Sequence, residues 1–243
     1  MKGQVIAVIP ARGNSKGIPQ KNIRPFLGQP LMAYTIREAQ RAKSIDRLIV
    51  STEARKVERI AQQYGAEVFR RPSKLAMDDT PINWVIENVL ERLNRESCHI
   101  EALVVLFSTS PLRTSTDIDN AVELARKFKR YDSIASVHEV DLAPFGGLTM
   151  RKGRLAYVVE GAKTMYRRQI TPVAYGLNGA IWVLNPDRLG FLNFSLLGEK
   201  SYGYVMARER SIDINTQFDW QIAECFAKRL WSLSRRKSRY ASL

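Results

Sequence analysis

The sequence predicts an α/β fold in which a mostly parallel sheet is flanked by helices. Short apolar runs alternate with amphipathic stretches of helical length, which is the pattern of βα units. The 243 residues are enough to bury a full core. Hydrophobic residues make up 45% and charged residues 26%, values that exclude disordered and collagen-like classes. No apolar run approaches the roughly 18 residues of a membrane-spanning helix, so we expect a soluble protein without a membrane span.

Apolar runs of strand length predict the strands of the sheet. The first strand is expected near residues 4–9, where VIAVI is continuously apolar. Further strands are expected at about residues 47–51, 66–70, 102–107, 132–138 and 178–184.

Helices are expected to fill the gaps between these strands. The first begins near Pro30, because proline suits the first position of a helix. The second runs from Glu53 to Tyr64, and Gly65 ends it.

The clearest helix runs from Pro81 to about Asn94, with Thr80 as its expected cap. Its apolar stripe indicates packing against the core and consists of Ile82, Val85, Ile86, Val89 and Leu93. A last amphipathic helix is expected from a cap at Thr216 to Leu230.

The βα rhythm fails between residues 142 and 170, where glycines and scattered basic residues replace it. We therefore expect a small insert over 142–170, between two core segments at 1–141 and 171–230. A basic tail follows over residues 231–243.

The chain is basic, with 38 Lys+Arg against 24 Asp+Glu and a net charge of +14. From Arg229 onward there are five basic residues and no acidic one, which leaves +9 on the rest of the chain. That balance favours polyanionic small substrates such as nucleotides. Nucleic-acid binding through the tail is the less favoured alternative. Cys98 and Cys225 form no CxxC spacing, which favours a reduced compartment and hence the cytoplasm.

A glycine-bearing loop, PARGNSKGIPQKN at residues 10–22, directly follows the first strand. Such a loop at the carboxyl end of a strand lets backbone N–H groups approach phosphate oxygens. Its cations Arg12, Lys16 and Lys21 suit a triphosphate. The spacing matches neither the Walker A nor the GxGxxG pattern, so P-loop ATPases and Rossmann dinucleotide enzymes are not supported. An ordinary basic surface loop is the alternative interpretation.

This loop resembles the signature of the acylneuraminate cytidylyltransferases, which make CMP-activated sialic acids and related nonulosonic acids from CTP. Four more blocks resemble the same family in the same order: residues 50–81, TSPLRT at 109–114, NGAIW at 178–182 and SIDINTQFDWQIAE at 211–224. The resemblance implies a Rossmann-like nucleotidyltransferase fold with a small dimerisation insert, a homodimer, and Mg²⁺ (or Mn²⁺) as cofactor. It also implies CTP and an acidic 3-deoxy nonulosonic sugar as substrates.

The family's functional residues map onto this sequence by those blocks. Arg12, Lys21 and Asp213 would be catalytic, with Lys21 nearest the α-phosphate. The nucleotide would be bound by Ala11, Arg12, Asn14, Ser15, Lys16, Lys21, Asn22 and Arg71.

The resemblance also implies sugar contacts from Phe107, Arg168 and Asn178. Phe107 stands where the family usually has a glutamine, which suggests a less polar sugar substituent. Metal ligands would be Asp213 and Asn215, although the family commonly has aspartate at both positions. The amide removes one negative charge and should weaken a metal site.

Neighbouring polar residues have structural interpretations. Asp219 is expected to favour the start of the last helix through its charge. Arg113 and Thr114 suit either a helix cap or a substrate contact.

Two other enzyme hypotheses stay open. A Kdo-type or other sugar nucleotidyltransferase is disfavoured by the long KGIPQKN form of the loop. A weak regulatory relative that binds nucleotide without turnover is suggested by Asn215 alone. The sequence does not identify which nonulosonic acid is used.

Overall fold

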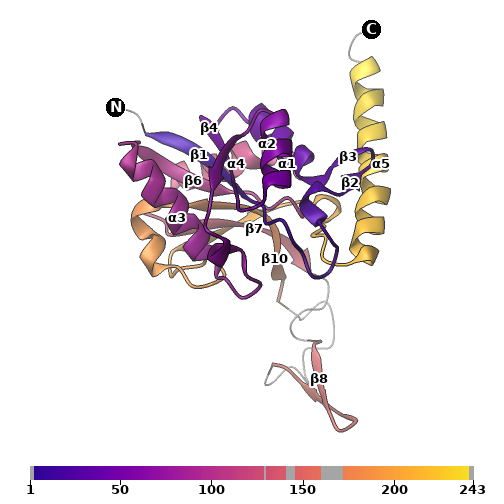
Figure 1. Ribbon diagram of the computed structural model, residues 1–243. Helices are drawn as coiled ribbons and strands as arrows, with labels where there is room; N and C mark the ends of the chain where they lie inside the picture. The colour runs from indigo at the N-terminus through magenta and orange to yellow at the C-terminus, as the bar shows by residue number, and fades with distance from the viewer. Residues whose placement is uncertain (1–2, 129, 141–145, 160–171, 241–243) are drawn as a thin grey trace.

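The computed structural model describes residues 3–128, 130–140, 146–159 and 172–240, with the backbone alone for 233–240 (Figure 1). Its centre is a seven-stranded sheet with the strand order β11-β7-β10-β6-β1-β4-β5. The strands are β1 (Gln4–Pro10), β4 (Arg47–Thr52), β5 (Glu67–Arg70), β6 (Ile100–Val105), β7 (Ser133–Val140), β10 (Ala174–Leu184) and β11 (Ser201–Val205). Only β10 runs antiparallel to its neighbours in this sheet, so the predicted mostly parallel sheet is confirmed.

Helices cover both faces of the sheet. The α-helices are α1 (Leu31–Arg41), α2 (Arg55–Gln63), α3 (Ile82–Arg95), α4 (Ser115–Lys127) and α5 (Gln217–Tyr240). Short 3-10 helices lie at η1 (Lys21–Ile23), η2 (Ser73–Ala76), η4 (Pro186–Phe191) and η5 (Arg208–Arg210). Two small hairpins complete the fold, β2 (Pro25–Phe26) with β3 (Gln29–Pro30) and β8 (Leu148–Arg151) with β9 (Arg154–Tyr157).

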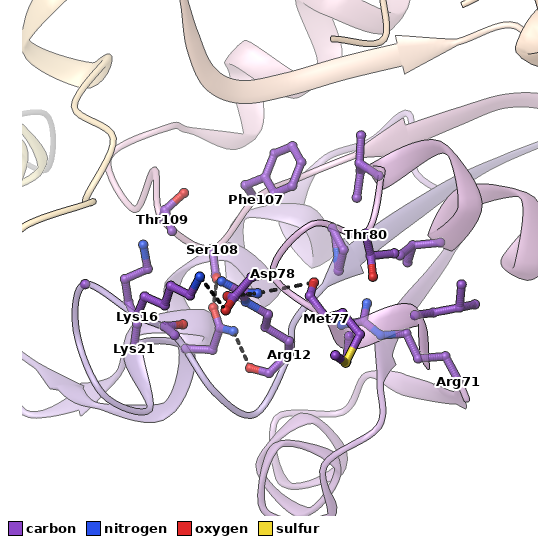
Figure 2. Close-up of a pocket in the computed structure, with 18 of the residues that line it drawn as sticks. Arg12, Lys16, Lys21, Arg71, Met77, Asp78, Thr80, Phe107, Ser108 and Thr109 are labelled. Atoms are coloured by element: carbon purple, nitrogen blue, oxygen red, sulfur yellow. Dashed lines mark hydrogen bonds and ion pairs between the residues drawn. The ribbon is translucent and has the colours of Figure 1, made fainter. Parts of the chain in front are cut away.

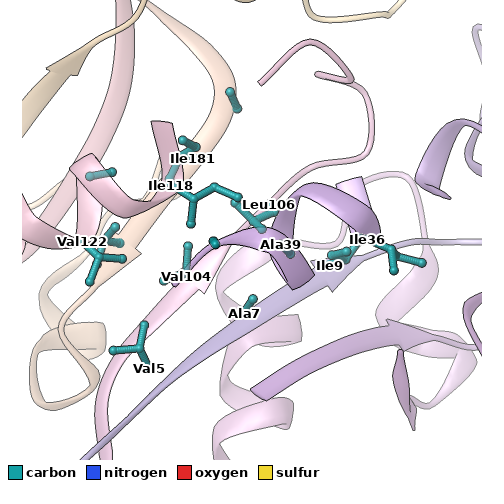
Figure 3. Close-up of a cluster of buried hydrophobic side chains, with 14 of the residues drawn as sticks. Val5, Ala7, Ile9, Ile36, Ala39, Val104, Leu106, Ile118, Val122 and Ile181 are labelled. Atoms are coloured by element: carbon teal, nitrogen blue, oxygen red, sulfur yellow. The ribbon is translucent and has the colours of Figure 1, made fainter. Parts of the chain in front are cut away.

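The alternation of side chains along β1 divides the core between the two faces of the sheet. Val5, Ala7 and Ile9 pack with buried side chains of α1, α2 and α4, as Figure 3 shows in part. Ile6 and Val8 face the other way and pack with α3 and η4. All five side chains are fully buried, so β1 is fixed from both sides and holds the loop that follows it in place.

A third apolar cluster attaches α5 to the body. Phe26 of the β2–β3 hairpin contacts Trp220 edge to face, with ring centroids 5.4 Å apart. Ile214, Leu112 and Ile18 are buried in the same cluster. The segment that carries Asp213 is thereby held against the loop after β1.

Several helix boundaries differ from the predictions. Pro30 is the N-cap residue of α1 and not its first helical residue, and α2 spans Arg55–Gln63 in place of residues 53–64. Thr80 does not cap α3: Pro81 is the N-cap residue, and the Thr80 hydroxyl instead donates to the Lys74 carbonyl at 3.2 Å. The last helix passes Leu230 and continues to Tyr240, well into the predicted basic tail (Figure 1).

Two predicted caps are confirmed. Thr114 forms a capping box with Asp117 at the start of α4. Thr216 accepts a hydrogen bond from the backbone N–H of Asp219 at 3.2 Å, while the Asp219 carboxylate accepts the Thr216 N–H at 2.7 Å. The charge of Asp219 is therefore used at the helix start, as expected.

Residues 146–159 are the described part of the predicted insert at 142–170. That part is the β8–β9 hairpin, a separate two-stranded sheet that lies apart from the central sheet (Figure 1). All eight of its strand residues are exposed. Among the described residues, no helix is long and apolar enough to cross a membrane.

Candidate active site

A cleft of about 370 Å³ opens where the parallel strands β1, β5 and β6 end (Figure 2). In open α/β sheets, this carboxyl edge is where ligands bind. One wall is the loop after β1, with Arg12, Lys16 and Lys21, and the other is the 71–82 stretch. Phe107, Ser108 and Thr109, which follow β6, also line the cleft, together with Asn215.

Three cations of the loop after β1, Arg12, Lys16 and Lys21, line this cleft. The Arg12 guanidinium lies 2.7 Å from one oxygen of Asp78, and the Lys16 ammonium lies 2.9 Å from the other. Hydrogen bonds from Lys16, and then from Arg12, lower the pKa of the Asp78 carboxyl. The Lys21 ammonium donates to the Ile214 carbonyl at 2.6 Å.

Lys21 is partly buried in the cleft. Burial lowers the pKa of its ammonium, and the nearby Asp213 carboxylate acts in the opposite direction. Gly17 permits this closeness, since a Cβ atom there would lie 2.4 Å from the Asn215 carbonyl oxygen. The loop after β1 therefore touches the backbone that carries the predicted metal ligands.

Asn22 fixes the shape of the loop from within. Its amide nitrogen donates to the Arg12 carbonyl at 2.8 Å, and its amide oxygen accepts from the Ser108 hydroxyl. Ala11 is buried and Asn14 is exposed. Neither residue is among the described residues that line the cleft.

Arg71 and Glu53 form a largely buried ion pair beside the loop after β1. Arg71 Nη2 lies 3.2 Å from Glu53 Oε2, while Glu53 Oε1 accepts from the Gly13 N–H at 2.6 Å. Burial lowers the pKa of the Arg71 guanidinium, and its Nε is buried without a hydrogen-bond partner among the described residues. Glu53 thus ties the cleft wall to the loop, a role that the sequence analysis missed.

The sequence position of Glu53 could have identified it as a candidate site residue. It is the first residue after β4, at the same sheet edge as the loop after β1. Polar residues directly after parallel strands meet at that edge, so Glu53 belonged among the candidates.

Asp213 has one oxygen that fits a metal ion. Its Oδ1 is buried and has no hydrogen-bond partner among the described residues, whereas its Oδ2 accepts from the Asn215 amide at 2.7 Å. Within the described ranges, no group of three His, Cys, Asp or Glu residues could hold a metal ion. An ion bound to Asp213 would therefore share its remaining positions with phosphate oxygens and water, which is how Mg²⁺ is commonly held.

The predicted sugar residues fall in different environments. Phe107 lines the cleft and packs edge to face on Trp182, with centroids 5.4 Å apart. Asn178 is 2% exposed, and its amide is hydrogen-bonded to Ser136 and Ser211 at 2.6 and 2.9 Å. Arg168 lies outside the described residues.

Arg113 is a buried residue that supports the lining of the cleft. Its side chain is 2% exposed and donates to the Phe107 carbonyl, so it holds the chain segment that lines the cleft. Burial lowers the pKa of its guanidinium to about 9. Thr114, not Arg113, provides the helix cap.

Comparison with known proteins places this cleft in a family. The family model described as "Cytidylyltransferase" matches residues 6–175. The chain is 32% identical over 230 residues to an N-acylneuraminate cytidylyltransferase of Escherichia coli, a match that covers 92% of this chain and 52% of that protein. It is 30% identical over 224 residues to a CMP-N,N'-diacetyllegionaminic acid synthase of Legionella pneumophila, covering 91% of this chain and 95% of that protein. The chain therefore spans about half the length of the first relative and nearly all of the second.

Solved structures share the fold. A CMP:2-keto-3-deoxy-manno-octonic acid synthetase complexed with CTP superposes with a TM-score of 0.70 at 14% identity, covering 93% of this chain and 99% of that one. A 4-diphosphocytidyl-2C-methyl-D-erythritol synthase gives a TM-score of 0.66 at 12% identity, covering 93% and 100%. The predicted Rossmann-like nucleotidyltransferase fold is confirmed. From the family match and the relatives at about 30% identity, the chain belongs to the cytidylyltransferase family, together with the acylneuraminate cytidylyltransferases.

Proposed function

We propose that the protein transfers CMP from CTP to the anomeric hydroxyl of a nine-carbon nonulosonic acid and releases pyrophosphate. One observation carries the proposal: Arg12, Lys16 and Lys21 converge in one cleft with the Asp213 segment, in a chain of the cytidylyltransferase family. A nucleoside triphosphate is the polyanion that this arrangement suits.

The proposed reaction is an attack of the sugar hydroxyl oxygen on the α-phosphorus of CTP. The O–P bond forms as the bond to pyrophosphate breaks, and the hydroxyl proton leaves to solvent or a nearby base. Catalysis of this kind depends on positioning and on neutralising phosphate charge. Lys21 is assigned to the α-phosphate, and Arg12 and Lys16 to the leaving pyrophosphate. A Mg²⁺ or Mn²⁺ ion on Asp213, with Asn215 as a neutral ligand, would add positive charge to the same phosphates.

The nucleoside part is assigned to the wall that carries Arg71. Its buried, unpartnered Nε is a donor for a cytosine or ribose oxygen. The backbone of Ala11, together with Asn14 and Ser15, is assigned to the nucleotide as well. Asn22 is assigned an indirect role in which it shapes the loop after β1. The nitrogen and the oxygen of its side-chain amide are both hydrogen-bonded within the protein.

The sugar is assigned to the side of the cleft formed by Phe107. Its aromatic edge favours an apolar part of the acid, such as an acyl methyl group. Arg168 is proposed to meet the sugar carboxylate. Asn178 is proposed to act indirectly, since its amide is bonded to Ser136 and Ser211.

We propose that the core comprises 1–141 and 171–230, with 142–170 as a dimerisation insert and 231–243 as the basic tail of a cytoplasmic homodimer. The β8–β9 hairpin supports a contact between copies, because large apolar side chains are exposed on it and just after it: Leu148, Met150, Leu155, Tyr157 and Val158.

Asn215→Asp tests the metal assignment. The added carboxylate is expected to lower the half-saturating Mg²⁺ concentration about tenfold, because affinity for hard cations rises with ligand charge. Activity is measured against Mg²⁺ concentration, and Mn²⁺ binding is measured by calorimetry without substrates. Asn120→Asp adds the same charge on the exposed surface of α4 and is the matched control.

Unchanged metal dependence in Asn215→Asp would remove residue 215 from the metal site. If the wild-type protein shows no turnover and Asn215→Asp does, the protein is instead a weak, regulatory relative that binds nucleotide without turnover. Substrate specificity is tested by pyrophosphate release from CTP with a panel of acids, in which a 3-deoxy-octulosonate represents the Kdo-type alternative.

A further inference from the structure

Asp78 lies on the wall of the cleft opposite the loop after β1, yet it pairs with two cations of that loop. Its Oδ1 is 2.7 Å from Arg12 Nη1, and its Oδ2 is 2.9 Å from Lys16 Nζ. The same Arg12 Nη1 also approaches the Met77 carbonyl at 3.5 Å. Figure 2 shows these contacts crossing the cleft. Both oxygens of one carboxylate are thus bonded to cations that a triphosphate needs.

A phosphate group and this carboxylate compete for the same donors. A phosphate oxygen at hydrogen-bond distance from Arg12 Nη1 and Lys16 Nζ would stand where the Asp78 oxygens now stand. Two anions at contact distance repel each other, so they cannot share the position without a further cation. Nucleotide binding through the N–H groups that Asp78 now occupies therefore requires Asp78 to move.

The chain around Asp78 forms a short unit that is attached to the body at its two ends, so it can move as a whole. It is bounded by Arg71, whose N–H donates to the Thr52 carbonyl at 3.0 Å, and by Ile82, where α3 begins. Between them, η2 contains no buried residue. The Thr80 hydroxyl bonds to the Lys74 carbonyl, which closes residues 74–80 on themselves.

The ion pairs that Asp78 forms with Arg12 and Lys16 are also easily replaced by those of another anion. The Asp78 side chain is 43% exposed and that of Lys16 is 79% exposed. Ion pairs at this exposure contribute little to stability, because water screens them. A triphosphate offers more negative charge to the same cations and replaces the carboxylate readily.

We propose that Asp78 is an internal counter-anion: without nucleotide it occupies the triphosphate position on Arg12 and Lys16, and triphosphate binding displaces it and releases residues 73–80. This inference rests on the proposed function, which names CTP as the nucleotide and assigns Arg12 and Lys16 to its phosphates. Asp78 lowers the affinity for free triphosphate, and it returns to the two cations when pyrophosphate leaves.

Asp78→Asn tests the proposal, with Asp79→Asn as the matched control. Asp79 is exposed and forms no ion pair with any other residue in the described part of the chain, so the control removes the same charge one residue away. CTP and inorganic tripolyphosphate are titrated calorimetrically without divalent ions. Asp78→Asn is expected to bind both about two- to fivefold more tightly than wild type, and Asp79→Asn nearly as wild type does.

Hydrogen exchange of the amides of residues 73–80 gives a second readout. In wild type and Asp79→Asn, exchange should accelerate when tripolyphosphate is added. In Asp78→Asn it should already be fast and should not respond. Equal or weaker binding by Asp78→Asn, or a wild-type segment that exchanges equally with and without ligand, would overturn the proposal.

The two readouts separate this inference from the proposed function. If tripolyphosphate releases the segment but CTP is never turned over, the counter-anion role stands and the enzymatic proposal fails. If CTP is turned over but Asp78→Asn behaves like Asp79→Asn, the enzymatic proposal stands and the counter-anion role fails.

Discussion

Lys21→Ala is expected to lower kcat for pyrophosphate release by at least about a hundredfold. The Lys21 ammonium is held at 2.6 Å from the Ile214 carbonyl, next to the Asp213 carboxylate. A charge placed in a half-buried cleft stabilises a developing phosphate charge more than the same charge in water does. Lys56→Ala, an exposed lysine of α2, is the control and should keep wild-type activity.

The pH profile distinguishes a charge effect from a loss of shape. Burial lowers the pKa of Lys21, so its positive charge is lost at a lower pH than that of an ordinary lysine. The wild-type rate should therefore fall as pH rises, and Lys21→Arg, which stays charged, should move this fall to higher pH. A Lys21→Ala rate within threefold of wild type would contradict the assignment.

Asp213→Asn should reduce kcat by about a hundredfold to a thousandfold, with a smaller change in the KM for CTP. The carboxylate has a buried oxygen without a partner among the described residues, and that oxygen is the assigned metal contact. Replacement by an amide keeps the shape and removes the charge. The Mg²⁺ dependence of the residual rate should weaken in parallel.

Stability provides the control for Asp213→Asn. The Oδ1 atom of Asp213 makes no hydrogen bond within the described part of the chain that the variant could lose. The melting temperature of Asp213→Asn should therefore be equal to that of wild type or higher. Asp187→Asn, an exposed carboxylate at η4, should leave both rate and metal dependence unchanged. Full activity of Asp213→Asn with wild-type metal dependence would place the metal elsewhere.

Most strands of the sheet were predictable because they contain apolar runs, and buried parallel strands need no other signal. The edge strand β11, with the sequence SYGYV, contains no such run and was not predicted. The end of α5 was not predictable from composition. The stretch after Leu230 contains no glycine or proline, and its Arg and Lys residues are good helix formers, so the helix continues to Tyr240. A basic run was therefore mistaken for the end of a helix.

The loop after β1 was predictable because its cations, glycines and preceding strand are adjacent in sequence. Asp78 was not, since it meets that loop from a separate part of the chain. Glu53 also comes from another part of the chain, but its place directly after β4 could have identified it. Asn178 was predicted as a sugar contact, and that role stays a prediction. Its amide is bonded to Ser136 and Ser211, partners far along the chain that no local pattern reveals.

The most direct measurement is pyrophosphate release with Mg²⁺ and a panel of nonulosonic acids, run with CTP and in parallel with ATP, GTP and UTP. The account predicts turnover with CTP and one of the acids, formation of the CMP-sugar in equal amount, and loss of both in Lys21→Ala. Equal turnover with the other nucleotides, or CTP binding without release for any acid, would contradict it.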